Sequence, residues 1–272
     1  MQVFSVQRGD GPIVLGQPHG GTYVPDEITA RLNDNGRGLA DTDWHINRLY
    51  KGILDDATVV RSHVHRYVID ANRDPFGASL YPGQNTTTLV PLTDFDGQQI
   101  WNDGQSPSED EVEDRRRKYH APYHAALLDE LSCVRDRHGV AILFDCHSIR
   151  SLIPFLFEGE LPVFNTGTND GLTCDTAIEQ AVHDVASKAE GFTSVLNGRF
   201  RGGWTTRHYG RPSDGIHAIQ MEIAQRAYMD ETSPWTWRED RAAKLRPHLT
   251  TMLTRLNDLA LSGELTRQGA QK

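Results

Sequence analysis

Residues 140–144 constrain the fold most strongly, because five consecutive apolar residues (VAILF) run directly into the polar sequence Asp145-Cys146-His147-Ser148. A strand with one solvated face alternates apolar and polar residues, whereas a strand buried on both faces reads as a continuous apolar run. Such a strand needs a covering layer on each side of its sheet. The run therefore predicts a central strand that ends at residue 144, with a polar cluster at its carboxyl end.

Further short strands and amphipathic helices alternate along the chain. Strands are predicted at residues 13–15, 58–60, 67–69 and 217–223, and helices at 42–54, about 108–137 with a kink at Pro122, 173–188 and around 245–256. This alternation favours a mostly parallel or mixed sheet with helices on both faces. We predict a three-layer α/β/α fold in one domain over residues 1–272, since no repeat or low-complexity linker divides the chain. Residues 75–107, rich in Pro and Gly, are predicted to form a long irregular excursion, often a functional element.

Composition excludes several classes of protein. The formal net charge is −9, which argues against nucleic-acid binding. No apolar stretch is long enough to span a membrane, and the amino terminus lacks the pattern of an export signal. Three widely spaced cysteines provide neither a disulfide framework nor a zinc knuckle. We therefore expect a cytoplasmic protein without a nucleic-acid or membrane partner.

Polar residues stand where the predicted strands end. His19 follows the first strand within Pro-His-Gly-Gly, and His147 follows the apolar run. Asp41 and Asp43 open the predicted 42–54 helix, which either could cap. The carboxyl ends of strands meet at one edge of such a sheet. Two imidazoles and one carboxylate there would leave a fourth position for water, the pattern of a catalytic zinc. The alternative is that the histidines are structural, since their spacing forms no self-sufficient motif.

Glu222 lies in an otherwise apolar predicted strand, where a carboxylate is costly unless it has a function or a partner. Burial would raise its pKa, which suits a general base, although pairing with a buried arginine is an equally good explanation. Arginine also recognises carboxylates in bidentate fashion. The candidate arginines are Arg73, which follows Asn72, and Arg150, which lies three residues after His147. Three more stand among Asn, Gly and Trp residues, namely Arg199, Arg201 and Arg207. Neither a serine-nucleophile elbow nor a nucleotide-binding glycine fingerprint is present.

Seven ordered blocks together resemble N-formylglutamate amidohydrolases of bacterial histidine breakdown. They are PHGGT (18–22), DTDWH (41–45), YVIDANR (67–73), LYPGQ (80–84), DCHSIRS (145–151), residues 197–212 and QMEIAQ (220–225). The family is similar in architecture to zinc carboxypeptidases. The resemblance implies a three-layer fold with a mixed sheet and one zinc held by His19, an acidic residue and His147. It also implies that Glu222 is the base and that Asn72-Arg73 holds a substrate carboxylate.

The acidic ligand departs from the peptidase pattern. Those enzymes carry H-x-x-E, but Thr22 stands at the acidic position here. The ligand must come from elsewhere, with Asp43 the first choice and Asp41 the second. The expected reaction is hydrolysis of N-formyl-L-glutamate to formate and glutamate, with zinc, iron, cobalt or manganese as the metal and Asn72, Arg73, Arg150, Arg201 and Arg207 around the substrate. The alternatives are hydrolysis of another N-acyl acidic amino acid or of a peptidoglycan-like amide, and a non-catalytic protein that binds acidic metabolites. The sequence leaves the oligomeric state open.

Overall fold

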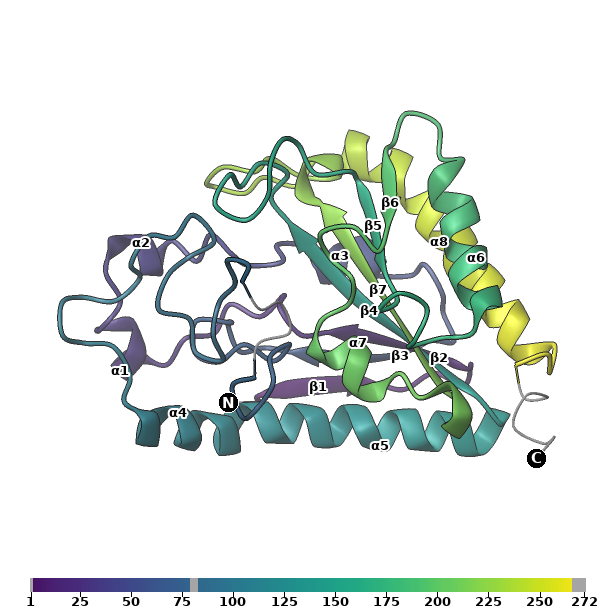
Figure 1. Ribbon diagram of the computed structural model, residues 1–272, viewed down its shortest axis with the longest axis horizontal. Coiled ribbons are helices and arrows are strands. Elements are labelled where there is room, and N and C mark those ends of the chain that lie inside the picture. Colours follow the sequence, from purple (N-terminus) through teal and green to yellow (C-terminus); the bar gives the residue numbers. More distant parts are fainter. Residues whose placement is uncertain (1, 79–82, 266–272) are drawn as a thin grey trace.

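One mixed sheet forms the centre of the computed structural model, which describes residues 2–78 and 83–265. Its strands are β1 (Phe4–Gln7), β2 (Ile13–Gln17), β3 (Thr58–Ser62), β4 (Ala141–Ile149), β5 (Phe164–Gly167), β6 (Ser194–Leu196) and β7 (Ile216–Ala224). They lie in the order β1-β3-β2-β4-β7-β5-β6 (Figure 1). The β3-β2-β4-β7 core is parallel, whereas β1 and β5 run antiparallel to β3 and β7. The predicted mixed sheet is confirmed.

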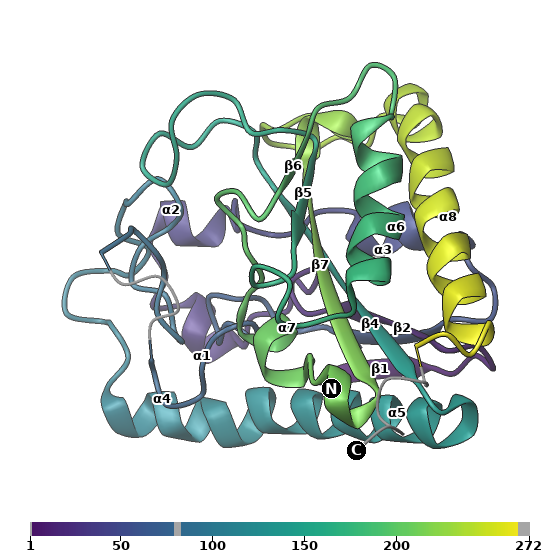
Figure 2. The same ribbon diagram turned by 45° about the vertical axis from the view of Figure 1, so that its right-hand side comes forward.

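Helices cover both faces of the sheet (Figures 1 and 2). One face carries α4 (Glu109–Arg115), the π-helical turn η1 (Arg116–His120), α5 (Ala121–His138) and α7 (Trp204–Tyr209). The other carries α3 (Ile46–Tyr50), α6 (Thr176–Ser187) and α8 (Glu239–Leu261). Leu143 of β4 packs in the α5 cluster, and its neighbour Phe144 packs in the α6 and α8 cluster. The apolar run is therefore buried on both faces, and the three-layer arrangement is confirmed.

Short helical segments complete the connections. They are α1 (Asp26–Thr29), α2 (Asp34–Arg37) and the 3-10 turns η2 (Pro212–Asp214) and η3 (Gln225–Ala227). Residues 75–107 are irregular where described, as predicted, and residues 80–82 of the LYPGQ block lie outside the described residues. Among the described residues, no helix is both long and apolar enough to cross a membrane.

The predicted helix at 108–137 begins where its cap residue indicates, because the Ser108 side chain accepts a hydrogen bond from the Glu111 N–H. Its irregularity differs from a simple kink at Pro122. The turn before the proline is π-helical, and the Ala121 N–H donates to the carbonyl of Arg116, five residues back. Pro122 has no N–H to donate to residue 118, so the ladder shifts by one residue there. In Figure 1, α4 and α5 continue as one long helix.

Two predicted boundaries were wrong. The central strand continues to Ile149, because β7 pairs with it residue by residue from Ala141↔Ile216 to Ile149↔Ala224. His147 therefore lies within the strand rather than after it. The helix predicted from residue 42 begins at Ile46, after His45 in the left-handed region at φ 60°. Asp41 and Asp43 thus precede the helix in a turn and do not cap it.

The strand predicted at 67–69 was also wrong. This segment is a turn in which the Val68 N–H donates to the His65 carbonyl at 2.9 Å and the Tyr67 N–H donates to His65 Nδ1 at 3.1 Å. The sequence misleads because Tyr67, Val68 and Ile69 are all buried, as they would be in a central strand. Periodicity alone does not distinguish a short apolar turn from a strand.

Candidate active site

Three buried side chains converge beyond β2. His19 follows β2 by two residues, Asp43 lies in the turn before α3, and His147 projects from β4. The Nδ1 atoms of the two histidines are 3.1 Å apart, and Asp43 Oδ2 lies 3.4 Å from His147 Nδ1 and 3.9 Å from His19 Nδ1. The three potential ligand atoms lie within 4.8 Å of one another. The structure thus brings together the two predicted histidines and one of the two predicted carboxylates.

A carboxylate stands behind each imidazole. His19 Nε2 donates to Asp70 Oδ1 at 2.7 Å, which directs the Nδ1 lone pair toward Asp43. His147 Nε2 lies 3.1 Å from Asp145 Oδ1 and 3.2 Å from Asn72 Nδ2. A metal at Nδ1 requires the proton on Nε2, where Asp145 is the group that can accept it, and the Asn72 amide is then a packing neighbour. Metal-binding histidines characteristically have such a partner on the second ring nitrogen. The donor set therefore fits a divalent metal with three protein ligands.

The electrostatics of the group favour a cation. Burial, followed by the Arg66 guanidinium, lowers the pKa of His19 to about 4, so its imidazole is neutral near pH 7. Burial acts on His147 in the same direction, but Asp145 and Asp43 outweigh it and hold the pKa of His147 well above its ordinary value. The raised pKa reflects a strongly negative potential at His147. A metal ion would be stabilised by the same potential.

Asp43 and Asp41 have different surroundings. Asp43 is held by Arg66 Nη2, which donates to its Oδ1 at 3.0 Å, and by the Ser148 N–H, which donates to its Oδ2 at 3.0 Å. Asp41 Oδ2 instead accepts from the Tyr67 hydroxyl at 2.8 Å and the Phe95 N–H at 2.9 Å. Asp41 therefore braces the loop around Phe95 and lies outside the convergent group.

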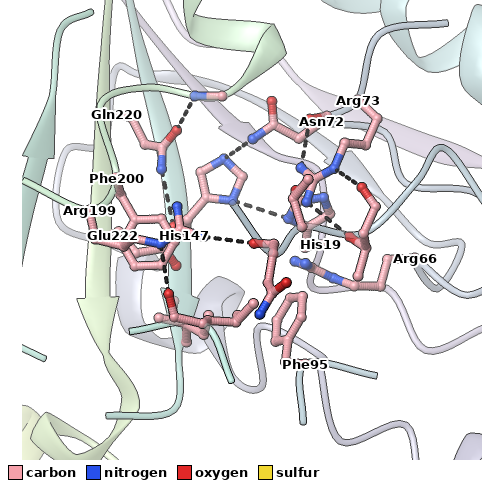
Figure 3. Close-up of a pocket in the computed structure, with 17 residues that line it drawn as sticks. His19, Arg66, Asn72, Arg73, Phe95, His147, Arg199, Phe200, Gln220 and Glu222 are labelled. Atoms are coloured by element: carbon pink, nitrogen blue, oxygen red, sulfur yellow. Dashed lines mark hydrogen bonds between the residues drawn. The ribbon is translucent and has the colours of Figure 1, made fainter. Parts of the chain in front are cut away.

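A pocket opens directly onto this group (Figure 3). It encloses about 600 Å³, counting its mouth toward solvent, and His19 and His147 line its floor. Gln220 and Glu222 of β7 also line it, while Ile219 and Met221 point into the opposite core, because successive side chains of a strand face opposite sides of the sheet. Glu222 sits beside His147 in the sheet register, and Gln220 Nε2 donates to its Oε2 at 3.1 Å. Burial above all raises the pKa of Glu222 to about 8.

Three arginines line the pocket, namely Arg66, Arg73 and Arg199. Arg73 is fixed against its wall, since Nε donates to the Thr87 carbonyl and Nη2 to the Thr87 hydroxyl, both at 2.9 Å. Arg199 donates through Nε to the Leu156 carbonyl at 3.0 Å and through Nη2 to the Asn85 carbonyl at 2.9 Å. Arg199 thereby ties together two loops at the mouth.

The other arginines predicted to bind substrate do not line the pocket. Arg150 pairs with Asp96 at 2.8 Å, Arg201 pairs with Asp170 at 3.1 Å, and Arg207 Nε donates to the Gly202 carbonyl at 2.9 Å. None of these three is among the described residues that line the pocket. Arg150 and Arg201 lie in loops and Arg207 lies in the six-residue helix α7, so no periodic pattern indicated which way each side chain points.

Sequence reasoning missed Arg66, Asp70 and Asp145. The two aspartates were within quoted blocks, and their positions next to Asn72 and His147 were the available signal. Arg66 was hidden because the turn that buries it was interpreted as the approach to a strand. Arg66 is 5% exposed, and its guanidinium carbon lies 4.9 Å from the centre of the Phe95 ring. A buried cation with two carboxylates nearby is a structural element of this site.

Fold and site together define a class. A mixed α/β sheet carries a buried group of two histidines and one carboxylate beside a pocket, and this is a type of ligand set that catalytic zinc sites use. The N-formylglutamate amidohydrolase family model matches residues 11–229. N-formylglutamate deformylases of Pseudomonas aeruginosa and Pseudomonas putida are 42% and 43% identical over 256 residues, 94% of this chain and 96% of each relative. The chain therefore belongs to the N-formylglutamate amidohydrolase family, and the resemblance seen in the sequence blocks is confirmed.

Solved structures support the fold. The crystal structure of an N-formylglutamate amidohydrolase from Ralstonia eutropha JMP134 has a TM-score of 0.79 at 24% identity, over 96% of this chain and 98% of that one. A gene product of Agrobacterium tumefaciens has a TM-score of 0.72 at 19% identity, over 95% and 96% of the two chains. At these identities the likeness shows a shared architecture.

Proposed function

We propose that this protein hydrolyses N-formyl-L-glutamate to formate and L-glutamate, with one divalent metal held by His19, Asp43 and His147. The observation that carries the proposal is the convergence of these three buried ligands beside a pocket that His19, His147, Glu222 and arginines line, in a chain of this family. As the family resemblance implies, the reaction would serve bacterial histidine degradation in the cytoplasm.

A bound divalent metal such as zinc would polarise the formyl carbonyl and acidify water. Glu222 then removes the proton of the attacking water and later delivers it to the leaving amine. A carboxylate whose pKa is raised to about 8 exchanges protons readily near neutrality, and a nearby metal cation shifts that value downward. The hydrogen bond from Gln220 Nε2 fixes the direction of the carboxylate.

Arg73 is the proposed partner of a substrate carboxylate, with Asn72 beside it. Nε and Nη2 each donate one N–H to Thr87, and Nη1 donates one N–H to the Asn72 carbonyl. Of the five N–H groups of a guanidinium, two remain for a ligand. N-formylglutamate has two carboxylates, and Arg199 supplies further positive charge at the pocket, whereas the charge of Arg66 is balanced by Asp43 and Asp70. These local cations offset the net charge of −9, which would otherwise repel an acidic substrate.

The decisive experiment combines metal analysis with formate release from N-formyl-L-glutamate. We expect about one metal ion per chain, loss of turnover on chelation and recovery on addition of zinc, cobalt, manganese or iron. Comparison of formyl-, acetyl- and succinyl-glutamate tests which acyl group the enzyme removes. Faster hydrolysis of a larger acyl group would show that the substrate is another N-acyl glutamate and not N-formyl-L-glutamate. Absence of bound metal together with absence of turnover after metal addition would favour the non-catalytic binding protein.

A further inference from the structure

The backbone of residues 68–73 carries Asp70, Asn72 and Arg73 but takes no part in the sheet. Its carbonyl groups therefore need partners from elsewhere. Three of them accept hydrogen bonds from side chains of the α4–η1–α5 helix. Arg115 Nη1 donates to the Val68 carbonyl at 3.1 Å. His124 Nε2 donates to the Ala71 carbonyl at 2.7 Å, and His120 Nε2 donates to the Arg73 carbonyl at 3.1 Å.

The two imidazoles hold the carbonyls on either side of Asn72. A carbonyl oxygen only accepts, so Nε2 of each histidine must carry the proton. His120 and His124 are four residues apart around Pro122, which places them on one helix face with ring centres 4.3 Å apart. Both are buried, at 2% and 7% exposure. The π-helical turn that ends at His120 sets the rotation of this face relative to α4, and such turns are frequent at functional sites.

His124 reaches Asn72 by a second route. With Nε2 protonated, its Nδ1 is an acceptor 3.0 Å from the Tyr209 hydroxyl, whose one proton also faces the His124 carbonyl at 3.1 Å. Tyr209 ends α7, which lies next to the long helix in Figures 1 and 2. The second residue of α7, Thr205, donates its N–H to Asn72 Oδ1 at 2.8 Å. One imidazole thus braces both elements that hold Asn72.

Asn72 has little freedom within these contacts. Its Oδ1 accepts from Thr205, so Nδ2 faces His147 Nε2, 3.2 Å away (Figure 3). With the Nε2 proton facing Asp145, this is a packing contact that limits the position of the His147 ring. A Cβ on Gly203 would lie 2.2 Å from Asn72 Nδ2, so the close approach of this backbone closes the remaining side. A shift of the 71–73 backbone would therefore move Asn72 relative to His147.

We propose that His120 and His124 are positioning residues, which hold the Ala71-Asn72-Arg73 backbone so that Asn72 meets His147 and Arg73 faces the pocket. The kinetic part of this inference rests on the proposed function. Its spectroscopic part does not, because the contact between Asn72 and His147 exists without substrate.

The test uses His124→Phe and His120→Phe, which keep an aromatic ring but remove the donor, and His124→Gln, which keeps an N–H group. The control is His217→Phe, which removes a similarly buried imidazole whose hydrogen-bond partner within the described part of the chain is the Asp175 N–H. For each protein we would measure the ring nitrogen resonances of His147, the affinity for Zn²⁺, and kcat and KM for N-formyl-L-glutamate. Melting temperature and circular dichroism supply the folded fraction.

Both Phe variants should shift the His147 ring resonances and lower zinc affinity or kcat/KM per folded molecule by about 10- to 100-fold, the usual effect of losing a residue that orients ligands. Since Arg73 contacts substrate, KM should rise. His124→Gln should recover part of the loss, and the control should leave all these quantities near wild type. Unchanged His147 resonances in a folded variant would overturn the inference, as would a loss equal to that of the control. If the wild type does not hydrolyse the substrate, the proposed function fails, and the resonances still decide the positioning role.

Discussion

The β4–β7 pair and the 65–73 segment both deliver site residues, but they hold them in different ways. In the strand pair, nine residues face nine across a parallel ladder, and backbone hydrogen bonds fix His147 and Glu222. In the segment, side chains such as His65, His120 and His124 satisfy the backbone. A side chain in the strand pair can therefore be substituted while the backbone keeps its position. In the segment, substitution of one of these side chains removes a hydrogen bond that holds the backbone.

The largest effect is expected from the residues of the convergent group. Since three protein ligands tolerate no loss, His19→Ala or His147→Ala should release the metal and reduce turnover to background while the strand ladder keeps the fold. Metal content and formate release would be measured on the same sample. A variant that retains full metal occupancy and a normal rate is not missing a ligand.

The matched pair Asp43→Ala and Asp41→Ala serves as the control. Only the Asp43 variant should behave like the histidine variants. Asp41 lies outside the convergent group, where its Oδ2 accepts hydrogen bonds from the Tyr67 hydroxyl and the Phe95 N–H. Loss of metal from the Asp41 variant alone would reverse this assignment.

Glu222→Gln should have the next largest effect, a loss of about 10²–10⁴-fold in kcat with metal content and melting temperature unchanged. Glutamine has nearly the same shape and can keep a hydrogen bond with Gln220, but it cannot accept a proton from water. If Glu222 were structural, the melting temperature would fall and the rate per folded molecule would remain. A normal melting temperature with a rate within about threefold of wild type would exclude the role of general base.

The same comparison explains what the sequence could predict. The layers, the sheet type and the grouping of His19, His147 and Glu222 near one edge of the sheet followed from apolar runs and alternation, since backbone pairing makes strand geometry a function of pattern. The pattern did not show that β4 continues past His147. The resemblance added Asn72 and Arg73, and the structure places both at the pocket.

The remainder depended on contacts distant in sequence. The 67–69 turn and the residues that follow it are stabilised by Arg115 and His124 of the long helix, more than forty positions away, and no local pattern records these contacts. The arginines in loops showed the same limit, since Arg199 lines the pocket whereas Arg201, two residues later, pairs with Asp170 on the surface. Asp145 was visible after the apolar run, but its place behind His147 required the three-dimensional arrangement.

Arg73→Lys tests the segment's role in binding and should affect KM more than kcat. A lysine ammonium cannot present the planar fork to a carboxylate or keep the contacts to Thr87. Loss of hydrogen bonds to a charged group costs about 1.5–3 kcal/mol, which corresponds to a rise in KM of about 10- to 100-fold. Arg201→Lys, outside the pocket, is the matched control and should be neutral. A loss confined to kcat would instead assign Arg73 to the transition state.

The smallest effect should appear in stability alone, at His65. Burial, aided by the Arg66 charge, lowers the pKa of His65 to about 3, because the ring is enclosed and Nδ1 already accepts the Tyr67 N–H. The unfolded chain, with an ordinary pKa near 6.5, therefore binds more protons, and stability is lost as pH falls from about 6.5 toward 3. Between pH 7 and pH 5 the contribution of this one residue is about 2 kcal/mol. His65→Gln keeps a donor for Thr42 and an acceptor for Tyr67 but does not titrate, so its free energy of unfolding should fall by about 2 kcal/mol less over that interval. Urea unfolding in excess chelator, which removes the pH dependence of metal binding, measures this difference, and parallel pH profiles for the two proteins would show that His65 is not held in its neutral form.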